Sequence, residues 1–156
     1  MRYPKPDVVH FFSHETKVSI ELPTGWELDE TDVRFAMYRA PQNTFGQAPT
    51  LIVRVLDVQI ADPEGYQKLA QQMLDLPRED MHLFSRDTLQ VDGFPGTVDV
   101  FSYYQDIVAQ QVIQYQVFVQ VEQVVFSITG MAEQESGETY LPVFEAAVRS
   151  VRFIPA

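Results

Sequence analysis

A strict alternation of side chains between residues 113 and 129 constrains the fold more than any other feature of this sequence. The first run alternates Ile113, Tyr115, Val117, Val119 and Val121 with Gln114, Gln116, Phe118 and Gln120. A period of two residues is typical of a β-strand with one buried face. Glu122–Gln123 then forms a tight turn into a second alternating run, Val124 to Thr129. The two runs therefore predict a β-hairpin in an antiparallel sheet with a one-sided core.

Shorter segments with the same period predict further strands. These segments are 17–22, 33–37, 51–55, 83–91, 97–104 and 151–154, and Asp92-Gly93 is a hairpin turn signal. Apolar residues at helical spacing predict two helices: one with Asp62 as its N-cap and Pro63 at its first position, ending at Pro77, and one over Tyr140–Ser150. We expect an α+β fold in which an antiparallel β-sheet packs with two main α-helices. Residues 1–15 form a lead-in, and residues 16–156 form a single domain.

Charge and composition exclude several classes of partner. The 156 residues carry 22 carboxylates against 11 Lys and Arg, giving a formal net charge of -11. Such a surface repels phosphate backbones and anionic lipids, so we expect neither nucleic acid nor a membrane surface as a partner. No apolar stretch is long enough to span a bilayer, so we expect a cytoplasmic protein without direct membrane insertion. The absence of cysteine excludes disulfides and zinc–cysteine sites.

No residues form a recognisable catalytic or metal-binding motif. His10 and His14 are four apart, but in an extended segment this spacing separates them by about 13 Å. Ser13-His14-Glu15 is a polar turn, because catalytic triads assemble in space and not in tandem. We therefore expect a protein that is not an enzyme, with no catalytic residues, no metal site and no cofactor.

Glutamine is concentrated in one part of the chain. Seven of the fifteen glutamines lie between Gln105 and Gln123. Gln114, Gln116 and Gln120 share one strand face with Phe118, and this face has two interpretations. It is either a neutral face in contact with solvent, or a recognition face whose amides bond a partner backbone beside apolar contacts. The candidate partner-binding residues are Gln72, Gln114, Gln116, Phe118 and Gln120.

Two segments carry a family resemblance. The stretch from Val18 to Trp26, with Pro23-Thr24-Gly25 inside it, resembles the strand-Pro-x-Gly-Trp opening of the PsbP-like superfamily, which includes DcrB-like proteins. The ending Phe144–Phe153 resembles the final helix and strand of that superfamily. The resemblance covers residues 16 to 154 and implies a PsbP-like α/β sandwich.

Within that superfamily the chain is similar to the Eag-type adaptor chaperones of type VI secretion. Gln116-Val117-Phe118-Val119 resembles their glutamine-containing strand, and Gln72-Met73 resembles the glutamine on their first helix. The greater acidity of this chain and its loop between Pro41 and Pro49 depart from the pattern. The likeness implies a homodimeric chaperone or adaptor for an apolar segment of a secreted or membrane-associated protein. The alternatives are a photosystem-associated or envelope accessory protein, and a domain with small-molecule or enzymatic activity.

Overall fold

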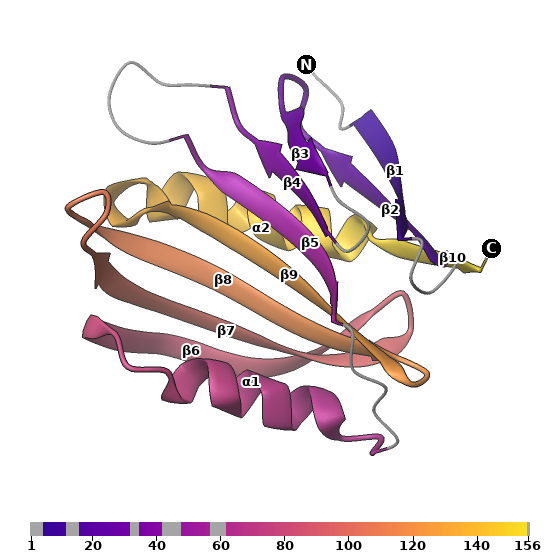
Figure 1. Cartoon of the computed structure of the whole chain (residues 1–156). Coiled ribbons are helices and arrows are strands. Elements are labelled where there is room, and N and C mark those ends of the chain that lie inside the picture. Colours follow the sequence, from indigo (N-terminus) through magenta and orange to yellow (C-terminus); the bar gives the residue numbers. More distant parts are fainter. Residues whose placement is uncertain (1–4, 12–15, 32–34, 42–47, 57–61, 156) are drawn as a thin grey trace.

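The computed structural model describes residues 5–11, 16–31, 35–41, 48–56 and 62–155 (Figure 1). The first half of the chain forms β1 (Lys5–Phe11), β2 (Thr16–Leu22), β3 (Glu27–Thr31), β4 (Phe35–Arg39), β5 (Thr50–Leu56) and α1 (Gly65–Asp75). The second half forms β6 (Glu79–Val91), β7 (Phe94–Gln105), β8 (Gln110–Val121), β9 (Val124–Glu133), α2 (Gly137–Ser150) and β10 (Arg152–Pro155). A short 3₁₀ turn, Gln134–Ser136, precedes α2.

The strands form two sheets. Seven strands make the larger sheet in the order β3-β4-β5-β9-β8-β7-β6, and the smaller sheet has the order β1-β2-β10. Every described strand pair is antiparallel. These sheets and the two helices confirm the predicted α+β fold.

The main core lies between the larger sheet, α2 and the smaller sheet. The apolar residues of the alternating run, from Ile113 to Val119 in β8, face this core together with Phe126 and Ile128 of β9. Val18 and Ile20 of β2 close it from the smaller sheet, and Phe144 and Val148 close it from α2. Helix α1 lies against the opposite face of the larger sheet, on β7 and β8 (Figure 1). The predicted one-sided core is therefore wrong, because helices cover both faces of β8.

Tight turns set the register of the two long hairpins. Asp92 and Gly93, between β6 and β7, have φ angles of 51° and 82°. Positive φ at both central residues is the backbone of a type I′ turn, whose twist matches that of the strands. Glu122, between β8 and β9, also has a positive φ, of 59°. The sequence predicted both turns correctly.

Three features of the N-terminal half and α1 differ from the sequence predictions. Residues 5–11 form strand β1, although the sequence predicted a lead-in without a strand there. Strand β3 was not predicted, and a bulge interrupts its pairing with β4 between Leu28 and Glu30. Helix α1 begins at Gly65, so Asp62 lies one turn before the helix and is not its N-cap residue. Among the described residues, neither helix has the length and apolar character needed to cross a membrane.

Gly130 allows α2 to approach the sheet closely. A Cβ atom at Gly130 would lie 2.5 Å from Cγ of Phe144, whose side chain is 1% exposed. A Cβ atom at Gly137, at the start of α2, would meet Cδ1 and Cγ2 of Ile113 at 3.4 and 3.6 Å. The first distance is a severe overlap, whereas the distances at Gly137 are close to those of ordinary van der Waals contact. The position of α2 on the sheet therefore depends on Gly130.

We predict that Gly130→Ala lowers the free energy of unfolding by about 1–3 kcal/mol, because the methyl group overpacks a filled core. Gly137→Ala is the matched control and should leave stability unchanged or slightly raised, because alanine is favoured over glycine in a helix. Urea denaturation of both variants and the parent gives the comparison. Equal stabilities for the two variants would contradict the close approach at Gly130.

Candidate functional site

The predicted glutamine face is buried. Gln114, Gln116 and Gln120 are 5%, 1% and 4% exposed, and Phe118 is 4% exposed. They do share one face of β8, opposite Tyr115 and the other core residues, as the alternation predicted. The interpretation of this face as solvated is wrong, and so is its interpretation as an exposed recognition face. Phe118 instead packs in a small cluster with Val125 and with Tyr66 and Ala70 of α1.

A chain of side-chain hydrogen bonds satisfies the buried amides. Tyr103 donates from its hydroxyl to Oε1 of Gln114 at 2.9 Å, and Gln114 donates from Nε2 to Oε1 of Gln116 at 2.8 Å. Thr129 donates to the same Oε1 of Gln116, also at 2.8 Å. We call these four residues the amide network; it crosses β7, β8 and β9. Because an unsatisfied buried amide costs about 1–3 kcal/mol, the network permits a polar strand face to be buried.

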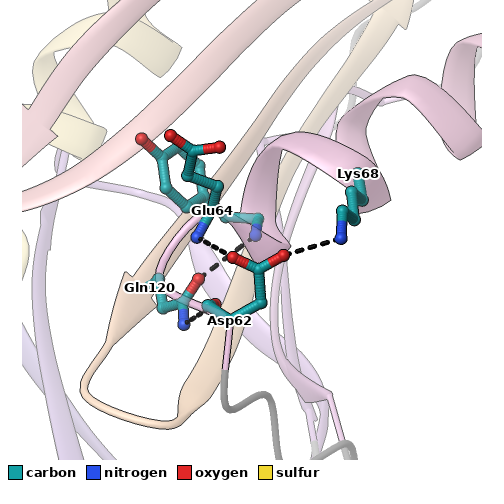
Figure 2. Close-up of polar contacts among 5 residues, drawn as sticks. Asp62, Glu64, Lys68 and Gln120 are labelled. Carbon is teal, nitrogen blue, oxygen red and sulfur yellow. Dashed lines mark hydrogen bonds and ion pairs between the residues drawn. The ribbon is translucent and has the colours of Figure 1, made fainter.

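Gln120 fixes the start of α1 (Figure 2). Its Oε1 accepts from the backbone N–H of Tyr66 at 3.2 Å, and its Nε2 donates to the backbone oxygen of Asp62 at 2.9 Å. The side chain of Asp62 accepts from the backbone N–H of Glu64 and forms an ion pair with Lys68 at 2.6 Å. These contacts meet polar groups of the first turn, which a helix cannot satisfy internally. Gln120 is thus a structural residue that anchors α1 to β8.

Gln72, the predicted contributor from α1, is exposed and lies apart from this buried face. The neighbouring Gln71 instead links α1 to the sheet, since Arg86 of β6 donates to its Oε1 at 2.6 Å. Nε of Arg86 also lies 3.3 Å from Oδ1 of Asp99 on β7. Sequence reasoning missed this link. Alternation within 97–104 would have placed Asp99 on the side of β7 that faces α1.

Asp99 is a buried carboxylate with incomplete compensation. It is 1% exposed, and its Oδ1 accepts no hydrogen bond from the described residues. Burial raises the pKa of Asp99 above its ordinary value of 3.8, and the nearby Arg86 charge opposes that rise. The raised pKa shows that desolvation outweighs the ion pair at this position.

The side of the sheet that carries α1 continues beyond the helix as an open surface. On β4, β5 and β9 this side includes Met37, Ile52, Thr129 and Met131, all half-buried. Helix α1 packs on β7 and β8, and α2 packs on the opposite face of the sheet. The apolar cluster under α1 extends to Val125 of β9 but does not include these four side chains, which we call the open face. Thr129 joins the open face directly to the amide network.

Arginine side chains and hollows border the open face. Arg54 of β5 is exposed and lies with its guanidinium 5.9 Å from the ring centre of Phe35 on β4. A hollow of about 120 Å³ includes Arg39, Thr50 and Met131 among its lining residues. A larger hollow of about 500 Å³ adjoins it and is lined by Gln110, Gln111, Glu133, Gln134 and Glu135. The open face therefore has apolar side chains, lies next to the amide network, and is bordered by two arginines in an otherwise acidic protein.

Titratable side chains in the described residues are dispersed. Within the described ranges, no three His, Asp or Glu side chains gather where they could hold a metal ion. His82 is exposed, and its Nε2 lies 3.0 Å from Oδ1 of the nearby Asp80. His10 lies in strand β1, and Ser13-His14-Glu15 lies outside the described residues.

Comparison with known proteins identifies the fold. No protein-family profile matches the sequence, and no curated protein matches it either. Among solved structures, LpqN of Mycobacterium tuberculosis, involved in cell envelope biogenesis, is similar with a TM-score of 0.69 and 16% identity, over 97% of this chain and 92% of LpqN. PA94 of Pseudomonas aeruginosa, a protein of unknown function named as a candidate regulator, has a TM-score of 0.64 and 13% identity, over 93% and 94% of the two chains.

The cyanobacterial PsbP protein, CyanoP, of Synechocystis sp. PCC 6803 is also similar. Its TM-score is 0.56 at 9% identity, and the match covers 96% of this chain and 92% of CyanoP. The fold is therefore PsbP-like, as the resemblance of the two terminal segments implied. At these identities the likeness concerns the fold alone.

We predict that Gln120→Ala destabilises the protein by about 1–3 kcal/mol, because the N–H of Tyr66 and the carbonyl of Asp62 lose a buried partner. Amide hydrogen exchange should accelerate most in the first turn of α1. Gln72 is an exposed residue of α1, so Gln72→Ala is the control, and its free energy of unfolding should stay within about 0.5 kcal/mol of the parent value. Unchanged exchange at Tyr66 in Gln120→Ala would show that Gln120 does not anchor the helix.

The raised pKa of Asp99 makes stability depend on pH in a defined direction. Between 3.8 and the raised value, the folded state binds more protons than the unfolded state, so stability falls as the pH rises through this window. We therefore expect the parent to gain stability relative to Asp99→Asn as the pH is lowered from 7 towards about 4. Urea midpoints of both proteins measured across this range test it. A stability difference that is constant with pH, or of opposite slope, would refute the raised pKa.

Proposed function

We propose that this chain is a non-enzymatic protein-binding domain, a chaperone or adaptor that shields an apolar segment of a partner protein. One observation carries the proposal: Met37, Ile52 and Met131 lie on an open face of the sheet, outside the apolar cluster under α1. Fully burying an exposed apolar side chain of this size is worth about 1.5–3 kcal/mol, so covering these three half-buried side chains contributes a part of that energy for each one.

The amide network supplies the polar part of the proposed recognition. Thr129 lies on the open face and is held by its hydrogen bond to Gln116, which is itself fixed by Gln114. A hydroxyl held in one orientation offers a bound backbone a partner at little entropic cost. In this proposal Gln114, Gln116, Phe118 and Gln120 act from beneath the surface. They position the binding strands and α1, and they do not touch the partner.

Charge favours one kind of segment. Arg39 and Arg54 border the open face, whereas the chain as a whole has a net charge of -11. We therefore propose an apolar segment with an acidic residue near its end, which would lie beside Arg54. The acidic surface elsewhere keeps the loaded protein soluble.

The resemblance to the Eag-type adaptor chaperones gives the proposal its narrower form. The partner would be a secreted or membrane-associated protein of the kind exported by type VI secretion, and the chaperone would act in the cytoplasm before export. The structural likeness to LpqN and CyanoP favours a second candidate, an envelope or photosystem-associated accessory protein with the same fold. Binding of an apolar segment at the open face distinguishes the two, because only the chaperone requires it.

We predict that the protein binds a synthetic apolar helix-forming peptide of about 20 residues with one terminal aspartate, carried on an uncharged polyethylene glycol tag. Ile52→Ser combined with Met131→Ser should weaken this binding about tenfold or more, because two buried apolar contacts are lost. Isothermal titration calorimetry measures both affinities.

Ile154→Ser is the matched control, since Ile154 is a 40% exposed apolar side chain on β10, in the smaller sheet. It should bind the peptide as the parent does. Absence of binding by the parent, or equal weakening by the control and the double variant, would remove the support for the open face.

A further inference from the structure

Helix α1 is held against the sheet by fewer buried apolar residues than α2. The apolar cluster beneath α1 has four buried residues, Tyr66, Ala70, Phe118 and Val125, whereas the main core that includes α2 has 21. Because apolar burial is the main favourable term in folding, separating α1 from the sheet costs much less than separating α2. Elements with few buried apolar contacts open locally before the rest of a protein unfolds.

The other described links to α1 are polar. Arg86 of β6 donates to Oε1 of Gln71 at 2.6 Å, and both side chains are exposed. Arg78 donates to the last turn of α1 at 2.7 Å, and its guanidinium lies 4.9 Å from the centre of an aromatic ring on β7. Gln120 binds the first turn. When such groups separate, each hydrogen bond is exchanged for one with water, so its net contribution is small.

The sheet surface beneath α1 satisfies its amides without the helix. Every hydrogen bond of the amide network joins two residues of β7, β8 or β9. Gln114 and Gln116 therefore keep these bonds when α1 moves away, and of the three buried glutamines of β8 only Gln120 loses partners on α1. A strand face with its own polar network can meet water at small cost, in contrast to the apolar face under α2.

Two buried oxygens beneath α1 gain from contact with water. Thr97 and Asp99 pair with Phe118 and Gln116 across the strands, so they lie on the same face of the sheet. Thr97 is 5% exposed and Asp99 1%, and neither Oγ1 of Thr97 nor Oδ1 of Asp99 accepts a hydrogen bond from the described residues. Burial also raises the pKa of Asp99, against the opposing charge of Arg86. Hydration relieves both groups, which lowers the free energy of an open state relative to the closed one.

We propose that α1 is a lid on the sheet: it opens as one unit while the sheet and α2 stay folded, and its opening uncovers the glutamine face of β8. Thr129 lies on the open face and is bonded to Gln116, so the uncovered surface is continuous with the open face. In the closed protein Gln116 and Phe118 stay beneath the surface, and in the open protein they extend the surface available to a partner. The movement itself needs no partner, whereas its effect on binding rests on the proposed function.

The absence of cysteine allows the lid to be tested with single thiols. Ala70 is 0% exposed on α1, and Ala147 is 2% exposed on α2. A thiol reagent should label Ala70→Cys about tenfold or more faster than Ala147→Cys, because local opening reaches the first thiol and only unfolding of the main core reaches the second. Low urea should accelerate labelling of Ala147→Cys and hardly change that of Ala70→Cys, since local opening exposes little surface. Equal rates with equal dependence on urea would overturn the lid.

A substitution in the main core separates local opening from global unfolding. Val18 is 0% exposed on β2 and belongs to the main core, not to the cluster under α1. Val18→Ala should accelerate labelling of Ala147→Cys about tenfold, because it favours the unfolded state over every state with a folded core. Labelling of Ala70→Cys should stay within about twofold, because the closed and open states lose the same contact. Parallel acceleration at both thiols would show that α1 leaves the sheet only on global unfolding.

Hydrogen exchange of the unsubstituted chain gives a readout that no introduced cysteine perturbs. The amides of α1 should exchange as a group, and faster than those of β8, β9 and α2. Their exchange should depend only weakly on low urea concentrations, whereas exchange in β8 should depend strongly on them. Protection of α1 as strong as that of β8 would refute the proposal, whatever the outcome of the peptide titrations.

Discussion

Burial of a polar strand face is the constraint on which the rest of this structure depends. β8 lies between β7 and β9. Its residues Gln114, Gln116 and Gln120 are buried, although its sequence has the alternation of a half-exposed strand. The amides can be buried only because Tyr103, Gln114, Gln116 and Thr129 satisfy one another across three strands. An apolar residue in place of Tyr103 or Gln116 would leave Oε1 or Nε2 of the buried Gln114 without this partner, at a cost of about 1–3 kcal/mol out of a domain's small net stability.

The same constraint explains how α1 is held. The apolar contact under α1 is small, with only Tyr66, Ala70, Phe118 and Val125 fully buried, whereas the core under α2 includes residues from both sheets. Polar links complete the attachment: Gln120 binds the first turn, and Arg86 connects the middle of the helix to Asp99. Asp99 reduces the benefit, because its desolvation outweighs its ion pair. Helix α1 is thus positioned by directional contacts more than by apolar area.

Because α1 packs mainly on β7 and β8, two regions of the larger sheet lie outside the apolar cluster under this helix. One is the open face on β4, β5 and β9, where apolar side chains lie beside arginines. The other is the β6 edge, where charge is nearly balanced and apolar side chains are exposed. In the sheet order β8 and β7 separate the strands of the open face from β6.

The sequence by itself determined every described strand except β1 and β3, the turns at Asp92-Gly93 and Glu122-Gln123, both helices and the α+β class. These depend on local features, namely periodicity, Asp92-Gly93 turn chemistry and the buried stripe of each helix. It also determined which residues share a face of β8, because a period of two leaves no other arrangement. It identified the glutamines as unusual, but it left their face to solvent or to a partner and did not predict that α1 covers it.

Only the tertiary structure decided what covers the glutamine face of β8. Alternation records that the two faces of a strand differ in polarity, but it does not record whether the polar face meets water or a helix. α1 approaches β8 from a distant part of the sequence, and the partners of Gln114 and Gln116 lie on neighbouring strands. Hydrogen bonds between residues remote in sequence have no periodic signature. The open face likewise arises from where α1 ends on the sheet, which depends on packing in three dimensions and not on the order of the residues.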